Sequence, residues 1–328
     1  MTRARLGVPD LGVGVGLRVP HYRDIIEHRP SVDFFEVISE NFMVPGGKPL
    51  YHLDRVLERY SVVQHGVSLG IGGPDPLDRS YLERLRQLVR RVRPAWVSDH
   101  FCWCSAGGAH LHDLLPLPYT PEAVQLVVER AREVQDFLEV RFALENTSSY
   151  LTYTSSGMPE WEFISEIADR ADIGILFDVN NVYVSAHNHG FDACEYVRSV
   201  PHERIVQIHL AGHTNAGKYI IDTHRGHVIE PVWDLYSETI RLTGSVSTLI
   251  EWDDDIPELP ILLAEAEQAK RVRDEALSAG SSARPLRADA RDEALEPGPT
   301  EGTAPARPWS QGGPREVASS DGSRLTGP

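Results

Sequence analysis

Histidine and carboxylate side chains that could bind a metal gather where apolar segments end. The clearest case is residues 204–227, RIVQIHLAGHTNAGKYIIDTHRGH, in which an apolar run leads to His209 and Asp222-Thr223-His224 follows. Because alternate residues of an extended segment point the same way, Asp222 and His224 can reach one point together. A converging carboxylate and imidazoles suit a divalent metal, although hydrogen-bonded structural histidines would give the same local pattern.

The same pattern recurs along the chain, because six consecutive predicted strands end in a residue that can ligate a metal. One such residue is commonly structural, but six in succession favour a metal site at which the strand ends meet. Asn181 follows the sixth strand, and Asp222 and His224 lie in the loop after the seventh. In chain order, the strand-end residues are His65, His100, Glu145, Asp178, His209 and Glu251.

These candidate ligands are too many for one ion, so we expect two or three ions with bridging carboxylates. Crowded carboxylates raise one another's pKa, and bound cations would relieve that repulsion. Nitrogen and oxygen donors without thiolate fit iron, manganese or zinc, and the donor types do not choose among these metals.

Other polar residues near the strand ends could contact the metal ligands or the substrate. Glu40 and Asn41 follow the second predicted strand, and loop capping explains them equally well. Cys102 and Cys104 are expected to pack within a loop. The remaining candidates are Asn146 and four histidines expected in loops: His187, His189, His213 and His227.

A site of this kind needs strands whose ends meet at one face, and the hydrophobic pattern predicts them. Alternating strand-like and helical segments favour parallel pairing with right-handed crossovers, and eight units predict a closed (β/α)8 TIM barrel. An open doubly wound sheet is the alternative, but it gives no reason for polar residues at so many strand ends. The long apolar connector 101–120 predicts a wall or lid. The predicted strands are 13–17, 32–38, 61–65, 95–100, 140–145, 173–178, 205–209 and 247–251, and the helices are 21–28, 50–60, 75–92, 121–138, 160–169, 192–200, 230–242 and 257–273.

The amino-acid composition limits which classes of protein this chain can belong to. The net charge of −16 argues against nucleic acid as a partner, and three cysteines in 328 residues do not form a disulfide framework. There is no apolar signal or membrane segment, so a cytoplasmic protein without membrane contact is expected. We expect residues 1–275 to form the barrel and the Pro-, Gly-, Ala- and Ser-rich residues 276–328 to be a disordered tail, or less simply a partner-binding arm around Trp309.

With these residues in view, the chain resembles the DUF692 family, also called UPF0276, of multinuclear non-haem iron-dependent oxidative enzymes, which includes the methanobactin biosynthesis enzyme. The resemblance covers about Gly12 to Arg273 and departs at Trp252, where arginine is more usual. The matching segments are SENFM (39–43), HGVSLG (65–70), SDH (98–100), ENTSSY (145–150), FDVNN (177–181), NHGFD (188–192), IHLAGH (208–213), IDTH (221–224) and TLIEWDDDIP (248–257).

The resemblance implies a xylose-isomerase-like TIM barrel that holds two or three irons. It also implies oxidation, with dioxygen and a mixed-valent iron pair, of cysteine residues in a ribosomally made precursor peptide presented by a separate partner protein. By position, His65, His100 and Glu145 look like the ligands of one iron, Glu145, Asp178, His209 and Glu251 like those of a second, and Asn181, Asp222 and His224 like those of an optional third.

Two other functions remain open from the sequence. One is a metal-dependent isomerase or phosphodiesterase of the same superfamily, and the other is a scaffold in which metals only stabilise a binding surface. The identity of the peptide, the product, the oligomeric state and the occupancy of the third metal position do not follow from the residues.

Overall fold

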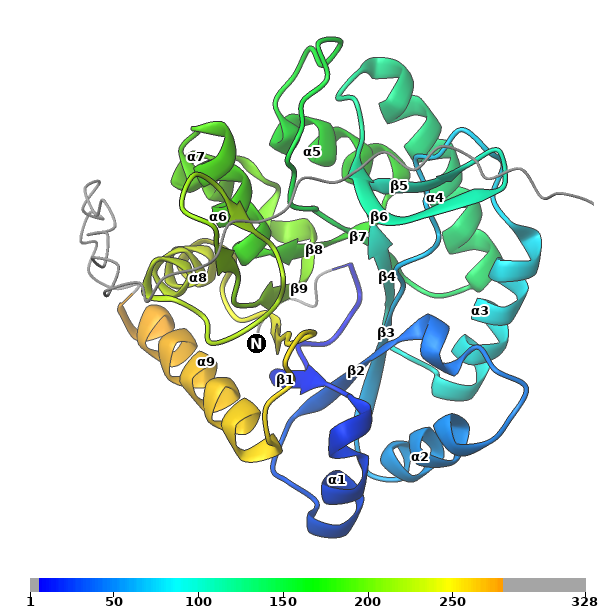
Figure 1. The fold of residues 1–328 in the computed structure, drawn as a ribbon, viewed down its shortest axis with the longest axis vertical. Coiled ribbons are helices and arrows are strands. Elements are labelled where there is room, and N and C mark those ends of the chain that lie inside the picture. The colour runs from blue at the N-terminus through cyan, green and yellow to red at the C-terminus, as the bar shows by residue number, and fades with distance from the viewer. Residues whose placement is uncertain (1–5, 280–328) are drawn as a thin grey trace, which may run out of the picture. The chain divides into compact units, whose positions relative to one another are not determined.

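The computed structural model describes residues 6–279, and eight parallel strands in it close into a barrel (Figure 1). Neighbouring strands follow the order β1-β12-β9-β8-β7-β4-β3-β2, so the predicted (β/α)8 barrel is confirmed. The barrel strands are β1 (Val13–Gly16), β2 (Phe34–Ile38), β3 (Ser61–His65), β4 (Val97–His100), β7 (Phe142–Glu145), β8 (Gly174–Asp178), β9 (Ile205–Leu210) and β12 (Ser247–Ile250).

The predicted C-terminal ends of the six site-bearing strands agree with the structure within one residue. Four of them, β3, β4, β7 and β8, end at the predicted metal-ligating residue itself. The reason is physical: a buried apolar run ends where polar side chains must leave the core or find partners. Parallel pairing, as between His100 and Glu145 on β4 and β7, then brings these ends together.

Helices surround the barrel and bury their apolar faces against it (Figure 1). Thr120 caps α4, since its hydroxyl accepts a hydrogen bond from the Ala123 backbone N–H at 3.3 Å. The helices are α1 (Tyr22–His28), α2 (Lys48–Leu57), α3 (Arg79–Val92), α4 (Pro121–Leu138), α5 (Glu160–Ala171), α6 (Val179–His189), α7 (Ala193–Ser199), α8 (Glu230–Thr243) and α9 (Leu259–Ala279), with short 3-10 turns at Val19–His21, Ser39–Phe42 and His202–Arg204.

The barrel interior is layered, because side chains two residues apart on a strand point to the same side. Val63 precedes His65 by two residues on β3, and Ala143 precedes Glu145 on β7. A separate apolar cluster therefore fills the interior beneath the polar strand ends and separates them from the opposite end of the barrel. It consists of Val8, Phe34, Val63, Trp96, Ala143, Val206 and Leu249.

Helix α6 was not predicted, and the placement of His187 and His189 in a loop is wrong. The segment VNNVYVSAHNH is buried over most of its length and shows no apolar stripe at helical spacing, so the amphipathic signal is absent. The helix begins because the Asp178 carboxylate accepts a hydrogen bond from the Asn181 backbone N–H at 2.6 Å.

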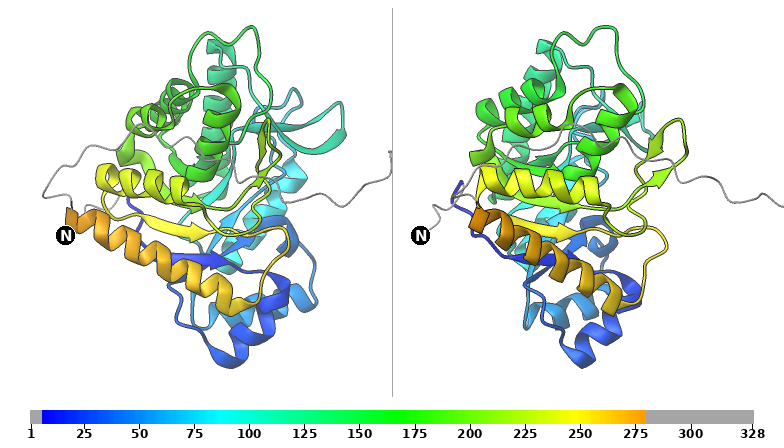
Figure 2. Two further views of the ribbon diagram at one scale, coloured as in Figure 1. Left: turned by 60° about the vertical axis from the view of Figure 1, so that its left-hand side comes forward. Right: turned by 90° about the vertical axis from the view of Figure 1, so that its left-hand side faces the viewer.

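Two further departures concern the connections at the C-terminal end of the barrel. The segment expected as an irregular wall or lid forms an antiparallel hairpin, β5 (Cys102–Ala106) with β6 (Ala109–Pro116). The connection after β9 contains a second hairpin, β10 (Thr214–Asn215) with β11 (Ile220–Ile221). Figure 2 shows both hairpins standing out from the same end of the barrel.

The last helix, α9, continues to Ala279, beyond the expected start of the tail at residue 276. Ala276 itself is buried, which explains why the helix extends past the predicted boundary. The rest of the expected tail, including Trp309, lies outside the described residues. Within residues 6–279, every helix is too short or too polar to span a lipid bilayer.

Gly14 on β1 provides a test of the barrel packing. A Cβ atom there would lie 2.5 Å from the Phe34 carbonyl oxygen, so Gly14→Ala should lower the free energy of unfolding by about 1–3 kcal/mol. Gly46→Ala is the matched control, because no atom lies within 4 Å of its added Cβ. Urea denaturation measures both, and equal unfolding midpoints for the two variants would contradict the packing.

Candidate multinuclear metal centre

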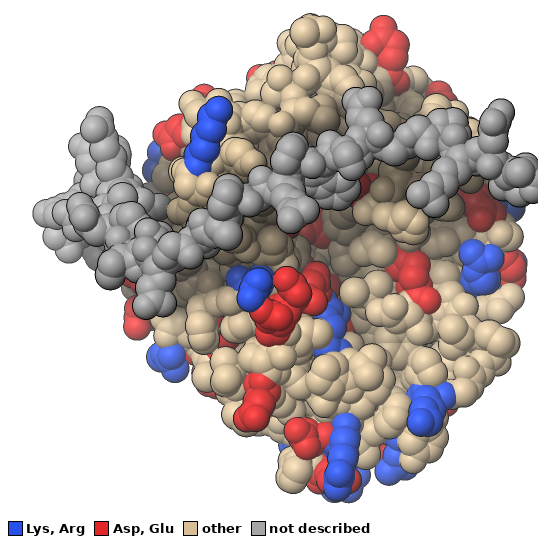
Figure 3. Space-filling model, in the orientation of Figure 1, with Lys and Arg blue, Asp and Glu red and all other residues tan. Residues whose placement is uncertain are grey.

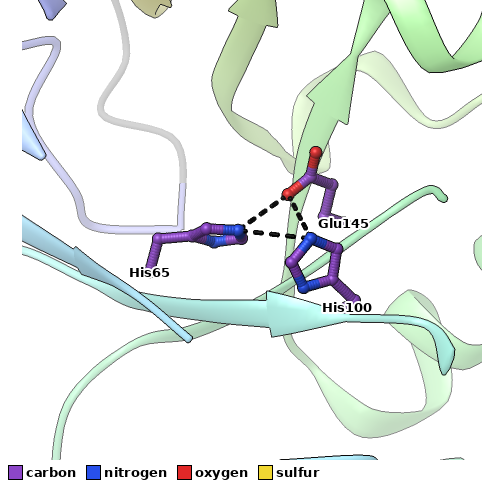
Figure 4. Close-up of side chains that lie close together, drawn as sticks. All are labelled: His65, His100 and Glu145. Carbon is purple, nitrogen blue, oxygen red and sulfur yellow. Dashed lines mark hydrogen bonds and ion pairs between the residues drawn. The ribbon is translucent and has the colours of Figure 1, made fainter. Parts of the chain in front are cut away.

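Three side chains from neighbouring strands converge at the mouth of the barrel (Figure 4). The Nε2 atoms of His65 and His100 lie 3.2 Å and 3.3 Å from the same oxygen of Glu145, Oε2. The two Nε2 atoms are 3.3 Å from each other. All three side chains are buried, and their donor atoms could ligate one ion. We call this group the first set.

The opposite nitrogen of each histidine in the first set is held by the protein. The Nδ1 atom of His65 lies 2.9 Å from the Ser98 hydroxyl, and that of His100 lies 3.1 Å from the Gly66 carbonyl oxygen. When Nδ1–H donates to these oxygens, Nε2 is left as an unprotonated ligand that points inward. Ser98 lies two residues before His100 on β4, so both side chains face the interior.

Glu145 also belongs to a second set, with Asp178, His209 and Glu251. The His209 Nδ1 atom lies 2.8 Å from Glu251 Oε2 and 3.7 Å from Glu145 Oε1. The two oxygens of Glu145 therefore face different sets, which is the arrangement of a carboxylate that bridges two ions. All four side chains of the second set are buried.

The sequence interpretation missed the residues that hold His209 from behind. Its Nε2 atom lies 3.2 Å from Glu36 Oε2, and the Gln207 amide donates to the same oxygen at 2.6 Å. Both residues are fully buried inside the barrel. The sequence does contain a signal for Glu36, because it is a carboxylate within the apolar run of β2.

His224 lies beside the second set, on the loop after β9. Its Nε2 atom is 2.9 Å from Asp222 Oδ1 and 3.8 Å from Asp178 Oδ2, so Asp222 and His224 do reach one point. The side chain of α6 that hydrogen bonds to Asp222 is Asn180, at 2.9 Å, which the sequence interpretation did not single out. On its other side, His224 forms a cluster with Glu251 and Asp253.

Hydrogen bonding within the described residues indicates which atoms of the cluster are available to bind an ion. Buried polar atoms are almost always hydrogen bonded, since leaving one unpaired costs about 1–3 kcal/mol. Here several such atoms without a hydrogen-bond partner point to one region, and metal ions fit them because every one is a potential ligand atom. They are Glu145 Oε1 and Oε2, Asp178 Oδ2, Asn181 Oδ1, His209 Nδ1, His224 Nε2 and Glu251 Oε2.

Burial and neighbouring charges shift the pKa values of the candidate ligands, and some of them hold a proton more strongly than usual. Burial, with the neighbouring His100 imidazole, holds the pKa of His65 well below its ordinary value. Burial opposes the charge on His100, but Glu145 and Asp99 outweigh it and raise the pKa of His100 to about 9. Burial raises the pKa of Asp178 well above its ordinary value. A metal that binds His100 and Asp178 must therefore displace protons.

The polar residues expected to contact the metal ligands or the substrate differ in how close they lie to the two sets. The buried Asn146 side chain binds the Asp178 main chain through two hydrogen bonds of 2.9 Å. His213 hydrogen bonds to Asn180 at 2.8 Å. Asn41 is exposed, and His189 at the end of α6 contacts Ser149 rather than the two sets.

Glu40 and Cys104 lie away from both sets, in the lining of a separate cavity of about 790 Å³ between α3 and the β5–β6 hairpin. The Glu40 carboxylate accepts hydrogen bonds from the Tyr81 hydroxyl and the Val67 backbone N–H. Cys102 and Cys104 are buried on β5, so the expectation that they pack within the connection holds, although that connection is a hairpin.

Comparison with known proteins identifies the family. The sequence model of the RiPP precursor modification enzymes MbnB/TglH/ChrH matches residues 12–274, where RiPP denotes a ribosomally synthesised and post-translationally modified peptide. The chain belongs to this family. A UPF0276 protein of Anaeromyxobacter sp. (strain Fw109-5) is 54% identical over 82% of this chain and 95% of its own length. One from Caulobacter vibrioides is 50% identical over 79% and 93%.

Solved structures are similar in fold at low sequence identity. A D-allulose 3-epimerase from Methylomonas sp. has a TM-score of 0.53 and 12% identity, covering 83% of this chain and 99% of that one. A 3-keto-D-glucoside 4-epimerase from E. coli has a TM-score of 0.52 and 14% identity, covering 80% and 99%. These likenesses are of fold alone, and they agree with the closed barrel of eight parallel strands.

Asn146 offers a test of the second set. Asn146→Ala removes both hydrogen bonds to the Asp178 main chain, so the position of the Asp178 carboxylate should loosen and metal content should fall. Asn188→Ala is the matched control, because Asn188 forms the same pair of bonds with Ile220, away from both sets. Inductively coupled plasma mass spectrometry measures metal per chain, and equal metal content in both variants would refute a role for Asn146.

Proposed function

We propose that this member of the family is an iron- and dioxygen-dependent enzyme that oxidises cysteine residues of a RiPP precursor peptide, with a separate partner protein that presents the peptide. The observation that carries the proposal is the buried Glu145 carboxylate, whose two oxygens face two adjoining ligand sets. Family membership supports a peptide substrate, and the donor set fits a pair of metal ions.

The residues are compatible with iron, and the choice of iron among the metals that fit these donors rests on the family resemblance. His65, His100 and Glu145 are two histidines and one carboxylate, which is the ligand set of many non-haem iron oxygenases that keep open positions for substrate and oxygen. In the second set, Asp178, His209 and Glu251 would complete the coordination of an ion that shares Glu145. An iron pair held by these residues would supply a binding position for the cysteine thiolate and one-electron redox chemistry by which dioxygen accepts electrons from the cysteine.

The protein itself positions the reactants and limits the access of water. The apolar layer beneath the strand ends closes the barrel from below, so the peptide enters from the mouth. Figure 3 shows the mouth as a hollow beside which acidic side chains gather. Exposed apolar side chains on the surrounding loops could contact the peptide. They are Tyr150 and Leu151 after β7, and Tyr219 and Ile221 on the β10–β11 hairpin.

Removal of the bridging carboxylate tests the shared site. In Glu145→Gln, an amide replaces the carboxylate in both sets, so we expect loss of most bound iron and of peptide oxidation. His28→Gln is a control that removes an exposed histidine on α1, and it should retain both. Metal analysis with Mössbauer spectroscopy on anaerobically reconstituted protein measures the effect. A Glu145→Gln variant with the iron content of the wild type would contradict the shared site.

The need for dioxygen separates the proposed oxidation from an isomerase or phosphodiesterase activity. The protein should be produced together with a short cysteine-containing precursor and a small partner protein encoded beside it, where such genes are found. Mass spectrometry of the peptide, with and without oxygen, should show a mass change only with oxygen and iron. Turnover that survives strict anaerobiosis, or stoichiometric zinc without oxygen consumption, would overturn the proposal.

A further inference from the structure

His224 lies between two pairs of carboxylates and faces each with a different ring nitrogen. Its Nε2 atom faces Asp222 at 2.9 Å and Asp178 at 3.8 Å. Its Nδ1 atom lies 3.3 Å from both Glu251 Oε2 and Asp253 Oδ2. One nitrogen can act as a metal ligand only if the other carries the proton, so the partner of Nδ1 decides what Nε2 can do.

His224, Glu251 and Asp253 lie close enough together to hold an ion on the Nδ1 side. The Nε2 side nevertheless offers more buried ligand atoms that have no hydrogen-bond partner. His224 Nε2, Asn181 Oδ1 and Asp178 Oδ2 are buried without hydrogen-bond partners, and Asp222 Oδ1 lies against Nε2. On the Nδ1 side, Glu251 Oε2 already lies 2.8 Å from His209 Nδ1 in the second set. Asp253 is the carboxylate there that belongs to neither the first nor the second set, and it can accept the Nδ1 proton.

We propose that Asp253, held by Arg18, is a positioning residue that fixes His224 with Nε2 toward a third metal position. The inference rests on the proposed metal centre and extends it to residues on the first and last strand–helix connections. The expected arrangement is a carboxylate–histidine–metal chain, in which Asp253 receives the proton of Nδ1 and leaves Nε2 free to ligate.

Arg18 fixes the Asp253 carboxylate from the other side. Its buried guanidinium forms an ion pair with Asp253 Oδ1 and lies 3.7 Å from Glu251 Oε1. Gly16 makes room for it, because a Cβ atom at Gly16 would lie about 3.0 Å from the guanidinium carbon. With Oδ1 bound to Arg18, the second oxygen, Oδ2, is directed to His224.

His224 and Asp253 are also joined through their main chains. The Asp253 N–H donates to the His224 carbonyl oxygen at 2.9 Å, and the next residues, Arg225 and Asp254, form a bridge. His224 has a φ of 46°, a left-handed conformation that is unfavourable for a residue other than glycine. Such strain persists only where surrounding contacts enforce it, and Asp253 supplies contacts to both the main chain and the ring.

The effect of removing Asp253 should be confined to the third position. Without it, the Nδ1 proton would turn to Glu251, which is engaged in the second set, and the His224 ring would lose its fixed orientation. Loss of such an outer carboxylate typically weakens metal binding by about 10- to 100-fold. The first set does not contact Asp253, so its affinity should remain that of the wild type.

The test is an anaerobic ferrous iron titration of the full-length protein, followed by metal analysis and Mössbauer spectroscopy. The wild type should bind three ions per chain. Asp253→Ala should bind two tightly and the third about 10- to 100-fold more weakly, with loss of one Mössbauer component. Asp254→Ala is the matched control, because it removes an exposed carboxylate from the adjacent position and should bind three ions as the wild type does.

A double mutant separates positioning from a general structural effect. If Arg18 acts on the third ion only through Asp253, then adding Arg18→Met to Asp253→Ala should not lower the affinity for the third ion any further. Far-UV circular dichroism and urea denaturation check that each variant folds. Should the double mutant fail to fold, Asp253→Ala alone still decides the question.

Three outcomes would overturn the inference. They are a wild type that binds only two ions, an Asp253→Ala variant that retains three at wild-type affinity, and a variant that loses all of its ions together. None of these depends on peptide oxidation. An enzyme that oxidises peptide with two ions would refute the third position while leaving the proposed function intact.

Discussion

The buried carboxylate of Glu145 is the group on which the architecture of the site depends. Its side chain lies inside the barrel, surrounded by imidazoles and other carboxylates, and neither oxygen has a hydrogen-bond partner. A buried carboxylate is costly to a fold unless neighbouring cations or hydrogen bonds compensate its charge. Its two oxygens face separate ligand sets, so a pair of cations explains both the burial of the carboxylate and its missing hydrogen bonds.

The protein also fixes the ring nitrogens that face away from the centre. Each candidate histidine uses one nitrogen for an outer partner and presents the other to the ligand sets, which determines the nitrogen that can bind an ion. The partners come from different elements, and two are carboxylates within or beside the barrel. They are Ser98 for His65, the Gly66 carbonyl for His100, Glu36 for His209 and Asp253 for His224.

The barrel is shared with sugar epimerases at 12–14% identity, so the fold does not select the chemistry. This chain is distinguished by the types of residue at the C-terminal ends of its barrel strands. Asp178 illustrates how closely fold and site are joined, since one of its oxygens caps α6 and the other faces the second set. A substitution at Asp178 would therefore disturb a helix start and a metal ligand together.

The sequence by itself determined the barrel and most of its candidate ligands. Strand ends such as His65 and Glu145 could be located because polar residues interrupt buried apolar runs with a period of two. Only the tertiary structure decided which of these side chains share an ion, since that depends on the register between strands distant in sequence. Helix α6, the outer carboxylate Glu36 and the Arg18–Asp253 pair were missed. A carboxylate within an apolar run marks Glu36 as unusual, but only the tertiary structure shows which side chains Glu36 and Asp253 contact. Helix α6 shows no apolar stripe because it is buried over most of its length.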